Sequence, residues 1–479
     1  MKLERFRVLS DADRAMVHKA TIEVLSTVGI RVHSPRVLQL LEKAGAKVDG
    51  SAKTALLPEA LVDKCLKSVP KTFSIFDRKG KREYTIGDRK PKFAAGHNAV
   101  FMVDPHDEKR VYAKVSDIDE YAVLVNMMEN IDIVGVPLNP QDVPAKSTLL
   151  HAMKSLYEYT DKPLYFSTES SGINAAIVDM MKAASGGKSI REYPSAIGQL
   201  SPTSPLYWEE GASEAAVKLA EDFVPLVLLP EPQSGVSAPY SVAGLLTIHN
   251  TEVVSGIVIA QSASPGSPLV YGSSWTTFDM KRGKAIIGSP ETNLLRIAGC
   301  EMADFYGIPS HTTAPNTDAN AHDQQMAWEK ALSSFCSAGV GNDIIMNSAM
   351  FATGLSVSHA QLLLDNEVNA YIARMCRGID VNPESIDVKS IQRVGHGGLY
   401  MEEELTFKNL RTGEFHEYGL PNSNSYDEWM VGGAKSNVTL AAEKAAELLK
   451  GKREKRLGTQ EIADIDDVIH RFEAAQKNG

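Results

Sequence analysis

Polar side chains of several chemical types crowd residues 317–325, where an apolar stretch leads through a loop into a helical pattern. The segment "GIPSHTTAPNTDANAHDQQMAWE" at 307–329 contains Asp318, Asn320, His322 and Asp323. Two interpretations fit. In one, Asn320 is the N-cap of the helix and Asp323 its third residue, a variant of the capping box. In the other, the loop lines a substrate cavity, and Asn320 and His322 face the ligand.

The spacing of these residues argues against a metal site. The stretch from Asp318 imitates a calcium loop, but Asp323 stands where the sharp turn of such a loop requires glycine. The sequence has no HExxH motif and no CxxC pair, and its 4 cysteines lie far apart. We therefore predict neither a bound metal nor a disulfide framework. No P-loop or dinucleotide-binding glycine motif stands in the right context either.

Aromatic and acidic residues gather near the ends of several apolar runs. Aromatic faces attract quaternary ammonium groups, which have no N–H to donate and cannot be recognised by hydrogen bonding. Core packing alone explains any single ring, whereas the set favours a pocket for a cation. The predicted substrate-binding rings are Tyr165, Phe166, Tyr207, Trp208, Tyr240, Trp275 and Phe278. The acids nearby in the sequence are Glu231, Glu252, Asp279 and Glu291.

The elements that must position these residues form a repeating pattern. Continuous apolar runs are typical of strands buried on both faces, and eight strand–helix units predict an α/β fold of the (β/α)8 TIM-barrel type. A doubly wound parallel sheet is the alternative. The eight runs lie near 93–102, 131–139, 162–168, 193–201, 224–232, 267–274, 308–313 and 342–348. We expect a helical N-terminal extension over 1–90, the barrel over 91–355, and C-terminal helices packing on it over 356–479.

Most of these runs become polar at their carboxyl ends, where a barrel places its active-site mouth. Three histidines, His97, His311 and His322, each lie near such an end and are candidates to bind a substrate carboxylate. The polar ends are Ser167-Thr168-Glu169, Gln199-Leu200-Ser201, Glu231, Gly272-Ser273-Ser274, Thr312-Thr313 and Asn347-Ser348.

Composition limits the class of partner. The formal net charge of −10 argues against nucleic acid, whose phosphates call for a basic surface. The apolar stretch 253–260 is too short to span a membrane, and the first residues lack the apolar core of a signal peptide. We expect a cytoplasmic protein.

Several long blocks of the sequence resemble the trimethylamine methyltransferase (MttB) family. They include "GSSWTTFDMKRGKAIIGSPETNLLRIAGCEMADFYGIP", "TDANAHDQQMAWE" and "GVGNDIIMNSAM". "TIEVLSTVGIRVHSPRVLQLLEKAGAKVD", "SPTSPLYW" and "PYSVAGLLTIHNTEVVSGIVIAQSASPGSPLVYG" extend the resemblance over nearly the whole chain. The resemblance implies a TIM barrel that transfers a methyl group from a methylamine to the Co(I) corrinoid (cobalamin) of a separate carrier protein, with no tightly bound cofactor of its own.

The resemblance also implies a departure at Asn320. Family members that use trimethylamine carry pyrrolysine in this segment, and the pattern "TDANAHDQQ" places Asn320 at that position. Asparagine has no electrophilic imine, so the chain is similar to the branch without pyrrolysine, which demethylates quaternary amines such as glycine betaine. Loss of methyl from a quaternary nitrogen leaves a neutral tertiary amine, so no acid must protonate the leaving group.

We therefore expect a methyltransferase acting on glycine betaine, with Asn320 and Glu231 as the catalytic candidates. Proline betaine, carnitine and γ-butyrobetaine are alternative substrates. Two other classes stay open: a hydrolase or lyase on the same barrel, using an acid pair such as Glu231 with Glu252, and a barrel that binds betaines without catalysis. The family resemblance further implies a homo-oligomer.

Overall fold

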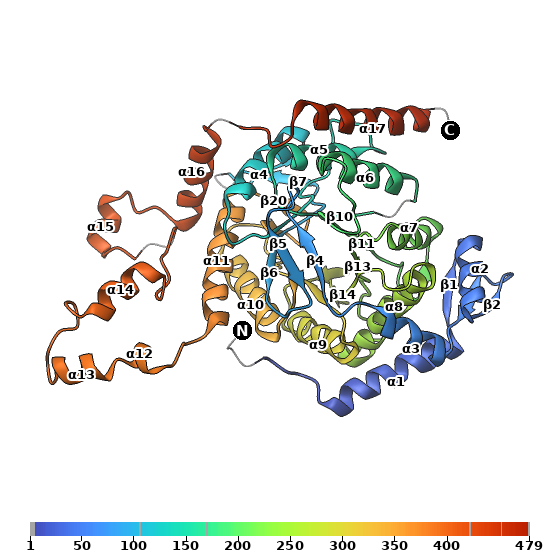
Figure 1. Cartoon of the computed structure of the whole chain (residues 1–479), viewed down its shortest axis with the longest axis horizontal. Helices are drawn as coiled ribbons and strands as arrows, with labels where there is room; N and C mark the ends of the chain where they lie inside the picture. The colour runs from blue at the N-terminus through green and yellow to red at the C-terminus, as the bar shows by residue number, and fades with distance from the viewer. Residues whose placement is uncertain (1–4, 105–106, 169–170, 421–422, 452, 478–479) are drawn as a thin grey trace.

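The computed structural model describes residues 5–104, 107–168, 171–420, 423–451 and 453–477. Eight parallel strands close into a barrel at its centre (Figure 1). Neighbouring strands are consecutive along the chain, and β18 pairs with β6 to close the ring. The strands are β6 (Lys92–Ala95), β9 (Ile133–Gly135), β10 (Leu164–Ser167), β11 (Ala196–Leu200), β13 (Leu226–Leu228), β14 (Leu269–Ser273), β17 (Ser310–Thr313) and β18 (Ile344–Ser348). The predicted TIM barrel is confirmed, and the doubly wound sheet is excluded.

A helix follows each barrel strand and packs outside the ring (Figure 1). The strands are buried on both faces, because one face fills the barrel and the other meets these helices. The helices are α4 (Val115–Met127), α5 (Thr148–Tyr159), α6 (Ser171–Ala184), α7 (Glu210–Glu221), α8 (Val242–Ala263), α9 (Pro290–Tyr306), α10 (Gln324–Val340) and α11 (His359–Arg377). Among the described helices, α8 has the length and apolarity to cross a membrane, and 72% of that apolar stretch is buried inside the protein.

The N-terminal extension is a small mixed unit rather than a purely helical one. It contains α1 (Asp11–Thr27), β1 (Ile30–Val32), α2 (Pro35–Ala44), β2 (Lys47–Asp49), β3 (Thr54–Leu56) and α3 (Glu59–Ser68). Its sheet runs in the order β12-β1-β3-β2, in which β12 (Tyr207–Trp208) comes from the loop after β11. The extension is therefore joined to the barrel by strand pairing as well as by packing of α1 and α3 on α8.

A hairpin of β4 (Phe73–Phe76) and β5 (Glu83–Ile86) closes the amino-terminal end of the barrel. In Figure 1 it lies across the centre of the ring. Ile75, Tyr84 and Ile86 belong to the same buried cluster as the residues that fill the barrel, among them Ile133 and Val227. The hairpin is therefore a plug of that end of the barrel.

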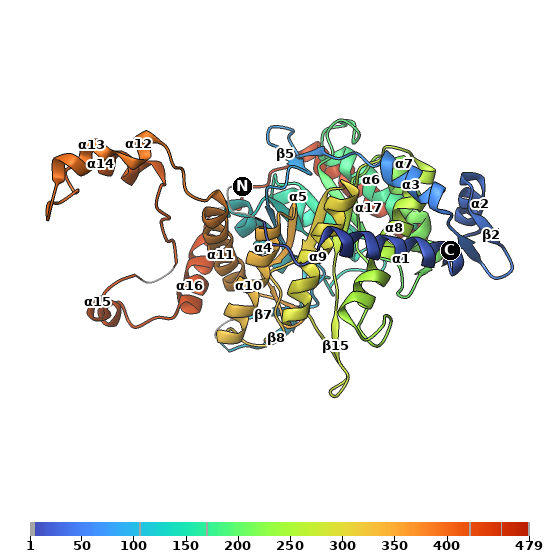
Figure 2. The ribbon, with the colours of Figure 1, turned by 90° about the horizontal axis from the view of Figure 1, so that it is seen from below.

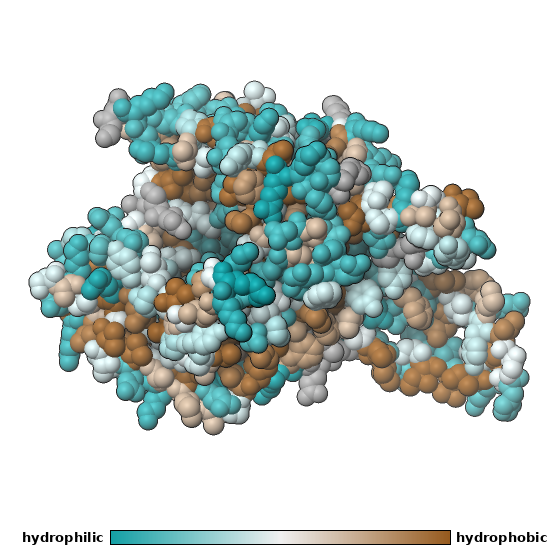
Figure 3. Space-filling view, turned by 180° about the vertical axis from the view of Figure 1, so that it is seen from behind, coloured by the Kyte–Doolittle hydropathy of each residue, from teal (hydrophilic) through white to brown (hydrophobic). Residues whose placement is uncertain are grey.

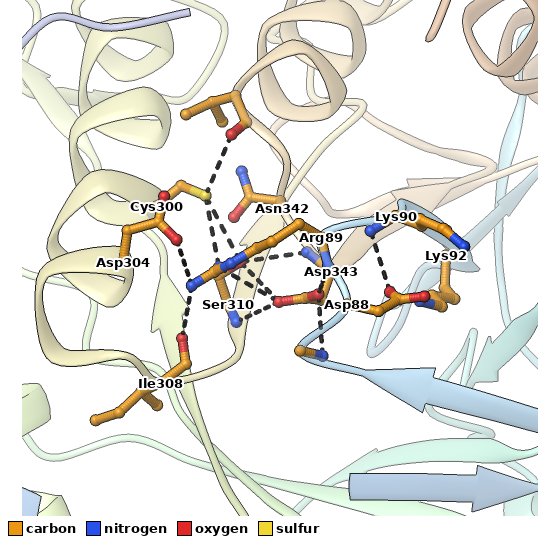
Figure 4. Close-up of polar contacts among 12 residues, drawn as sticks. Asp88, Arg89, Lys90, Lys92, Cys300, Asp304, Ile308, Ser310, Asn342 and Asp343 are labelled. Atoms are coloured by element: carbon orange, nitrogen blue, oxygen red, sulfur yellow. Dashed lines mark hydrogen bonds and ion pairs between the residues drawn. The ribbon is translucent and has the colours of Figure 1, made fainter. Parts of the chain in front are cut away.

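Next to this plug, Arg89 connects the segments that lead into three of the barrel strands (Figure 4). The fully buried Asp343 carboxylate accepts hydrogen bonds from the backbone N–H of Arg89 at 2.8 Å and of Ser310 at 2.9 Å. The Arg89 guanidinium donates to Ser310 Oγ at 2.8 Å and lies 2.5 Å from Asp304 Oδ1. These contacts tie the segments leading into β6, β17 and β18 to one another.

Short strands and hairpins surround the opposite end of the barrel, which lies toward the lower edge of Figure 2. A hairpin of β15 (Thr277–Asp279) and β16 (Lys284–Ile286) follows β14. A small sheet in the order β19-β20-β7-β8 combines segments that follow β6 and β18. Its strands are β7 (Phe101–Val103), β8 (Arg110–Tyr112), β19 (Met350–Phe351) and β20 (Ser356–Val357).

The C-terminal segment has two parts with different surroundings. The helices α16 (Asn437–Leu449) and α17 (Thr459–Lys477) pack against α11, α4 and α6 on the outside of the barrel. Between α11 and α16, α12 (Pro383–Ile386), α13 (Val388–Val394), α14 (Glu404–Thr412) and α15 (Tyr426–Val431) extend away from the barrel (Figures 1 and 2). The expectation that the C-terminal helices pack on the barrel is wrong for these four, in which Ser390 is the one buried residue among those described.

Candidate active site

A cavity of about 520 Å³ opens at the carboxyl ends of the barrel strands. This is a typical size for a small-molecule site, and it lies at the end where TIM barrels place their catalytic residues. Its lining comes from seven of the eight strand ends and consists mainly of hydroxyl and amide side chains. The lining residues include His97, Ser167, Thr168, Gln199, Ser201, Ser204, Glu231, Gln233, Ser274, Thr276, Thr313, Asn316, Asn347, Met350 and Thr353. Glu169, also expected here, lies outside the described residues.

The charge of this cavity is set by Glu231. Among the described residues that line it there is no lysine or arginine, and Glu231 carries the one carboxylate. Ser274 Oγ donates to Glu231 Oε1 at 3.2 Å, which holds the carboxylate in place without neutralising it. Glu231 itself is exposed to the cavity and its solvent. A cation that enters the cavity would meet this negative group and no positive one.

Beneath the lining lies a column of three rings. Tyr165 is fully buried, and its Oη donates to Gln199 Oε1 at 2.7 Å. His97 meets the Tyr165 ring edge-on at a centroid distance of 5.3 Å, and His311 stacks on it at 5.4 Å. Burial lowers the pKa of His97 to about 4 and that of His311 to about 3, so both imidazoles are neutral at pH 7. His97 reaches the cavity, whereas His311 lies one layer deeper.

Several buried polar atoms around this column have no hydrogen-bond partner in the structure. Those on the cavity lining are His97 Nδ1, Ser167 Oγ and Asn347 Oδ1. In His311 both ring nitrogens lack a partner. An unsatisfied buried polar group costs about 1–3 kcal/mol, and the three on the lining are placed where a molecule in the cavity can bond to them.

The turn after β18 is strained where it meets the cavity. Asn347 has φ 128°, Ala349 78°, Ala352 52° and Thr353 56°, values that residues with a Cβ rarely adopt. A buried ion pair behind the turn holds it, with Lys330 Nζ 2.9 Å from Asp365 Oδ2. Lys330 Nζ also donates to the Met350 carbonyl, and Asp365 accepts from the Ala349 N–H. This pair therefore positions the side chains that the turn presents to the cavity.

The predicted aromatic pocket is not formed. None of the seven predicted rings is among the described residues that line the cavity, and His97 is the one aromatic residue among them. Trp208 is buried and donates to Ser255 Oγ at 2.9 Å, and Tyr207 contacts His33 and Glu209 beside the N-terminal sheet. The remaining rings are dispersed: Tyr165 is beneath the lining, Phe166 and Trp275 are buried, Phe278 is half-buried on β15, and Tyr240 is 70% exposed.

Strand geometry explains why these rings do not converge. Successive side chains of a strand point to opposite faces, so Tyr165 enters the barrel while Phe166 joins the layer between strands and helices. Trp275 has left the barrel strand and packs against His249 of α8 at a centroid distance of 4.0 Å, with the two rings tilted by 33°. Proximity to a strand end in the sequence therefore does not place a side chain in the cavity.

The loop at residues 317–325 has a structural role at the rim. The N-cap of α10 is Asp323, whose side chain accepts from the Met326 N–H, so the prediction of Asn320 as N-cap is wrong. Asn320 is exposed, and its Oδ1 accepts from Arg110 Nη2 at 2.7 Å. His322 Nδ1 lies 2.9 Å from Glu108 Oε1, and its Nε2 lies 3.0 Å from Ser358 Oγ. Neither Asn320 nor His322 lines the cavity.

The second acid of the suggested acid pair also lies outside the cavity lining. Glu252 is buried on α8 and accepts from Ser204 Oγ at 2.7 Å and from the Leu206 N–H at 2.8 Å. Burial raises the pKa of Glu252 to about 7. Glu252 thus supports the loop that carries the lining residue Ser204, and a hydrolase that pairs Glu231 with Glu252 has no geometric support. In the described parts of the chain, no group of three or more His, Cys, Asp or Glu residues is arranged to hold a metal ion.

The cavity is lined by amide side chains that the sequence did not predict as individual site residues. Gln199 and Asn347 stand in the polar strand ends noted in the sequence, so that signal was sufficient to find them. Asn316 and Gln233 follow their strands by a few residues and gave no such signal. In the structure Asn347 Nδ2 donates to Asn316 Oδ1 at 2.7 Å, which links two neighbouring strand ends across the mouth.

Comparison with known proteins agrees with this architecture. The model of the family described as "Trimethylamine methyltransferase (MTTB)" matches residues 1–476. The chain is 33% identical over 461 residues to trimethylamine methyltransferase MttB of Methanosarcina thermophila, covering 94% of each chain. It is 27% identical over 430 residues to glycine betaine methyltransferase of Desulfitobacterium hafniense, covering 89% of each.

A solved structure shares the fold. The monomethylamine methyltransferase MtmB of Methanosarcina barkeri superposes with a TM-score of 0.51 at 12% identity, covering 94% of this chain and 95% of that one. At this identity the match shows the fold alone. The family match over nearly the whole length, together with the barrel and the cavity at its mouth, shows that the chain is a methyltransferase of the trimethylamine methyltransferase (MttB) family.

Proposed function

We propose that this enzyme transfers a methyl group from a quaternary amine, with glycine betaine as the first substrate to test, to Co(I) of a corrinoid carried by a separate protein. The observation that carries the proposal is the distribution of charge in the cavity. One carboxylate, Glu231, stands among neutral donors and acceptors, and no described lining residue is cationic. Such a cavity suits a molecule with a permanent positive charge.

Glu231 would hold the ammonium end. A quaternary nitrogen cannot donate a hydrogen bond, so a carboxylate attracts it by charge alone and need not point directly at it. Methyl loss leaves a neutral tertiary amine, and for this reason the cavity needs no acid near the leaving nitrogen. The chain's own contribution is to orient the N–CH₃ bond toward the mouth and to replace water around the cation.

Neutral donors would hold the opposite end of the substrate. His97 Nδ1 and Ser167 Oγ are buried without partners, and a carboxylate could accept from both. With its pKa lowered to about 4, His97 donates as a neutral imidazole. A cavity of about 520 Å³ exceeds the needs of glycine betaine, so proline betaine, carnitine and γ-butyrobetaine are alternative substrates of the same class.

A corrinoid fits this site as a group brought by another protein. Glu231 is exposed at the mouth, so the substrate can be reached from outside, and the other described lining residues are neutral and rich in hydroxyl groups rather than a set of metal ligands. When docked, the corrinoid supplies the Co(I) nucleophile that accepts the methyl group. The lining residues bind and align the amine beneath it.

Trimethylamine, which the names of most relatives specify, is the main competing substrate. At neutral pH it is also a cation, but it has no second polar end for His97 and Ser167. Asn320, the residue at the expected pyrrolysine position, is exposed and bonded to Arg110, and it offers no electrophile. A barrel that binds betaines without catalysis would fill the same cavity and transfer nothing.

The test combines binding and transfer. Calorimetry should detect binding of glycine betaine, proline betaine, carnitine or γ-butyrobetaine, and weaker binding of trimethylamine. In the presence of the protein, the betaine that binds should methylate Co(I) cobalamin. Glu231→Gln should weaken binding, whereas Glu192→Gln, an exposed glutamate before β11 at the other end of the barrel, should not. Binding and turnover of trimethylamine alone would overturn the proposal. Betaine binding without methyl transfer to Co(I) would also count against a betaine as the substrate.

A further inference from the structure

Asp318, the first of the four polar residues in the loop before α10, joins two walls of the cavity. Its Oδ2 accepts hydrogen bonds from the backbone N–H groups of Gly288 at 2.8 Å and Ile287 at 3.1 Å, and its Oδ1 accepts from Thr353 Oγ1 at 3.0 Å. Ile287 directly follows β16, whereas Thr353 belongs to the turn after β18, and both line the cavity. The Asp318 carboxylate therefore supports two parts of the lining at once.

A buried arginine holds the same segment through its carbonyl group. Arg296 on α9 is 2% exposed, and its guanidinium donates to the Ile287 carbonyl at 2.9 Å and to the Thr313 carbonyl at 2.7 Å. Thr292 Oγ1 also donates to the Ile287 carbonyl, at 3.0 Å. Both backbone polar groups of Ile287 are therefore fixed by side chains from other parts of the chain.

The neighbouring Gly288 shows how closely this segment fits its surroundings. A Cβ at this position would lie 2.6 Å from Cδ of Glu329 on α10, which is too close for two carbon atoms. Glu329 in turn accepts from Thr317 Oγ1 at 2.6 Å and from the Asp318 N–H at 2.9 Å. The backbone after β16 therefore has little freedom to move.

The hairpin that carries Ile287 adjoins the charged side of the cavity. The loop after β13, which contains Glu231 and Ser234, is bonded to the hairpin, because the Ser234 N–H donates to the Thr276 carbonyl at 3.2 Å. In the antiparallel pairing of β15 and β16, Ile287 after β16 lies opposite Thr276 before β15. Both residues line the cavity. Ile287 therefore stands on the side of the cavity that also carries Glu231.

An apolar side chain beside a carboxylate suits a quaternary ammonium group, whose charge needs the carboxylate and whose methyl groups favour apolar contact. Figure 3 shows the face opposite the plug, with hydrophilic residues over its centre, so apolar surface at the cavity is a local feature of its walls. The described lining residues with apolar side chains are Pro202, Ala285, Ile287 and Met350. Met350 contacts the backbone N–H of His97, at the end proposed for the substrate carboxylate. Ile287 is thus the largest apolar side chain on the Glu231 side.

We propose that Ile287 is the wall against which the N-methyl groups of the substrate lie, that it determines which ammonium groups the enzyme accepts, and that Asp318 is the positioning residue that holds it. This inference rests on the proposed function, which supplies a substrate with N-methyl groups beside Glu231. Glu231 attracts the cation, and Ile287 limits the size of its substituents. A wall fixed in this way also keeps the N–CH₃ bond from turning away from the mouth.

The first experiment compares two methyl donors that differ by one methylene. Transfer to free Co(I) cobalamin is measured for glycine betaine and for its analogue in which one N-methyl group is replaced by ethyl. The wild type should prefer glycine betaine in kcat/KM by about 10–100-fold, since one methylene in a fitted pocket is worth that much. Ile287→Ala should reduce this preference about tenfold, and the milder Ile287→Val about twofold to threefold. Ile286→Ala, at a position that is not among the described lining residues, should keep it.

A second experiment tests Asp318 without relying on any substrate. Asp318→Asn replaces one acceptor oxygen by an N–H₂ group, so the amides of Ile287 and Gly288 should exchange with solvent about fivefold to tenfold faster in the ligand-free protein. Asp279→Asn is the matched control, because Asp279 accepts from two backbone N–H groups at the tip of the same hairpin, and it should leave both amides unchanged. In methyl transfer, Asp318→Asn should lower kcat about tenfold with KM within about twofold, as misalignment predicts.

The outcomes separate this inference from the proposed function. An Ile287→Ala variant with the preference of the wild type would overturn the wall, and unchanged amide exchange in Asp318→Asn would overturn its positioning. If the wild type demethylates trimethylamine and no betaine, the proposed function fails, and the same ratio is measured for trimethylamine and ethyldimethylamine. A preference that falls in Ile287→Ala would support the wall for that substrate, and one that stays would overturn it.

Discussion

The two ends of the barrel treat polar groups in opposite ways. At the amino-terminal end, the Arg89 guanidinium lies 3.4 Å from the buried Asp343 carboxylate, and both groups bond to Ser310 (Figure 4). At the carboxyl end, His97 Nδ1, Ser167 Oγ and Asn347 Oδ1 are buried without partners. At the amino-terminal end the buried charges are paired and Asn342 Oδ1 is a buried polar atom without a partner, whereas at the carboxyl end three such neutral atoms face one cavity.

This difference separates stability from function within one fold. At the amino-terminal end, the charged groups that close the barrel bond to one another. Groups without partners destabilise the folded protein, and they persist where a ligand completes their bonds. The strained turn after β18 belongs to the same end and is held by the Lys330–Asp365 ion pair. The contrast predicts different outcomes for substitutions at each end.

The largest effect on stability is expected at the closed end. Arg89→Met leaves the fully buried Asp343 carboxylate without its cation, which should lower the free energy of unfolding by about 3–5 kcal/mol. Urea denaturation measures this. Arg471→Met, which breaks an exposed pair with Asp467 on α17, should change it by less than about 0.5 kcal/mol. Equal effects of the two variants would remove the structural role assigned to Arg89.

A substitution at the mouth of the barrel should lower activity rather than stability. Glu231→Gln removes the carboxylate that faces the substrate cation, and methyl transfer should drop about 30–100-fold, equivalent to about 2–3 kcal/mol. The free energy of unfolding should stay within about 0.5 kcal/mol of the wild type, because Glu231 is exposed. A variant that is strongly destabilised but fully active would reverse the assignment of the two ends.

Glu252 lies just outside the mouth and should make stability depend on pH. Its pKa in the folded protein is about 7, above the ordinary value of 4.5, so the folded state holds a proton that the unfolded chain releases. The free energy of unfolding therefore falls as pH rises from about 4.5 to about 7, and the loss is complete above that range.

Glu252→Gln should remove this dependence. Between pH 5 and pH 8 the wild type should lose about 2–3 kcal/mol more than the variant, as measured by urea denaturation across pH. Glu192→Gln, at an exposed position, should follow the wild type. Parallel curves for wild type and Glu252→Gln would show that Glu252 is not protonated in the folded protein.

The smallest effect is expected at Asn320. Asn320→Ala removes one exposed hydrogen bond to Arg110, worth about 0.5 kcal/mol, and methyl transfer should stay within about twofold of the wild type. Steady-state assays with saturating substrate test this. A loss of more than tenfold would restore Asn320 to the catalytic site despite its exposed position.

The order of strands and helices in the barrel could be predicted from the sequence because it depends on local patterns. Each strand is a short apolar run buried on both faces, and each is followed by a helix, so eight repeats were sufficient to predict the closed ring. The polar strand ends likewise predicted Ser167, Gln199, Glu231 and Asn347 at the mouth, where the cavity lies.

The composition of the site depended on contacts that no local pattern contains. The pairing of β12 with β1 draws Tyr207 and Trp208 to the N-terminal sheet, and strand alternation turns Phe166 outward. Whether Asn320 or Asp323 caps α10 depended on where the loop meets Arg110. The sequence by itself determined the barrel and the polarity of its mouth. Barrel closure alone decided which side chains, far apart along the chain, share one cavity, because that requires the distances between strands and not their individual patterns.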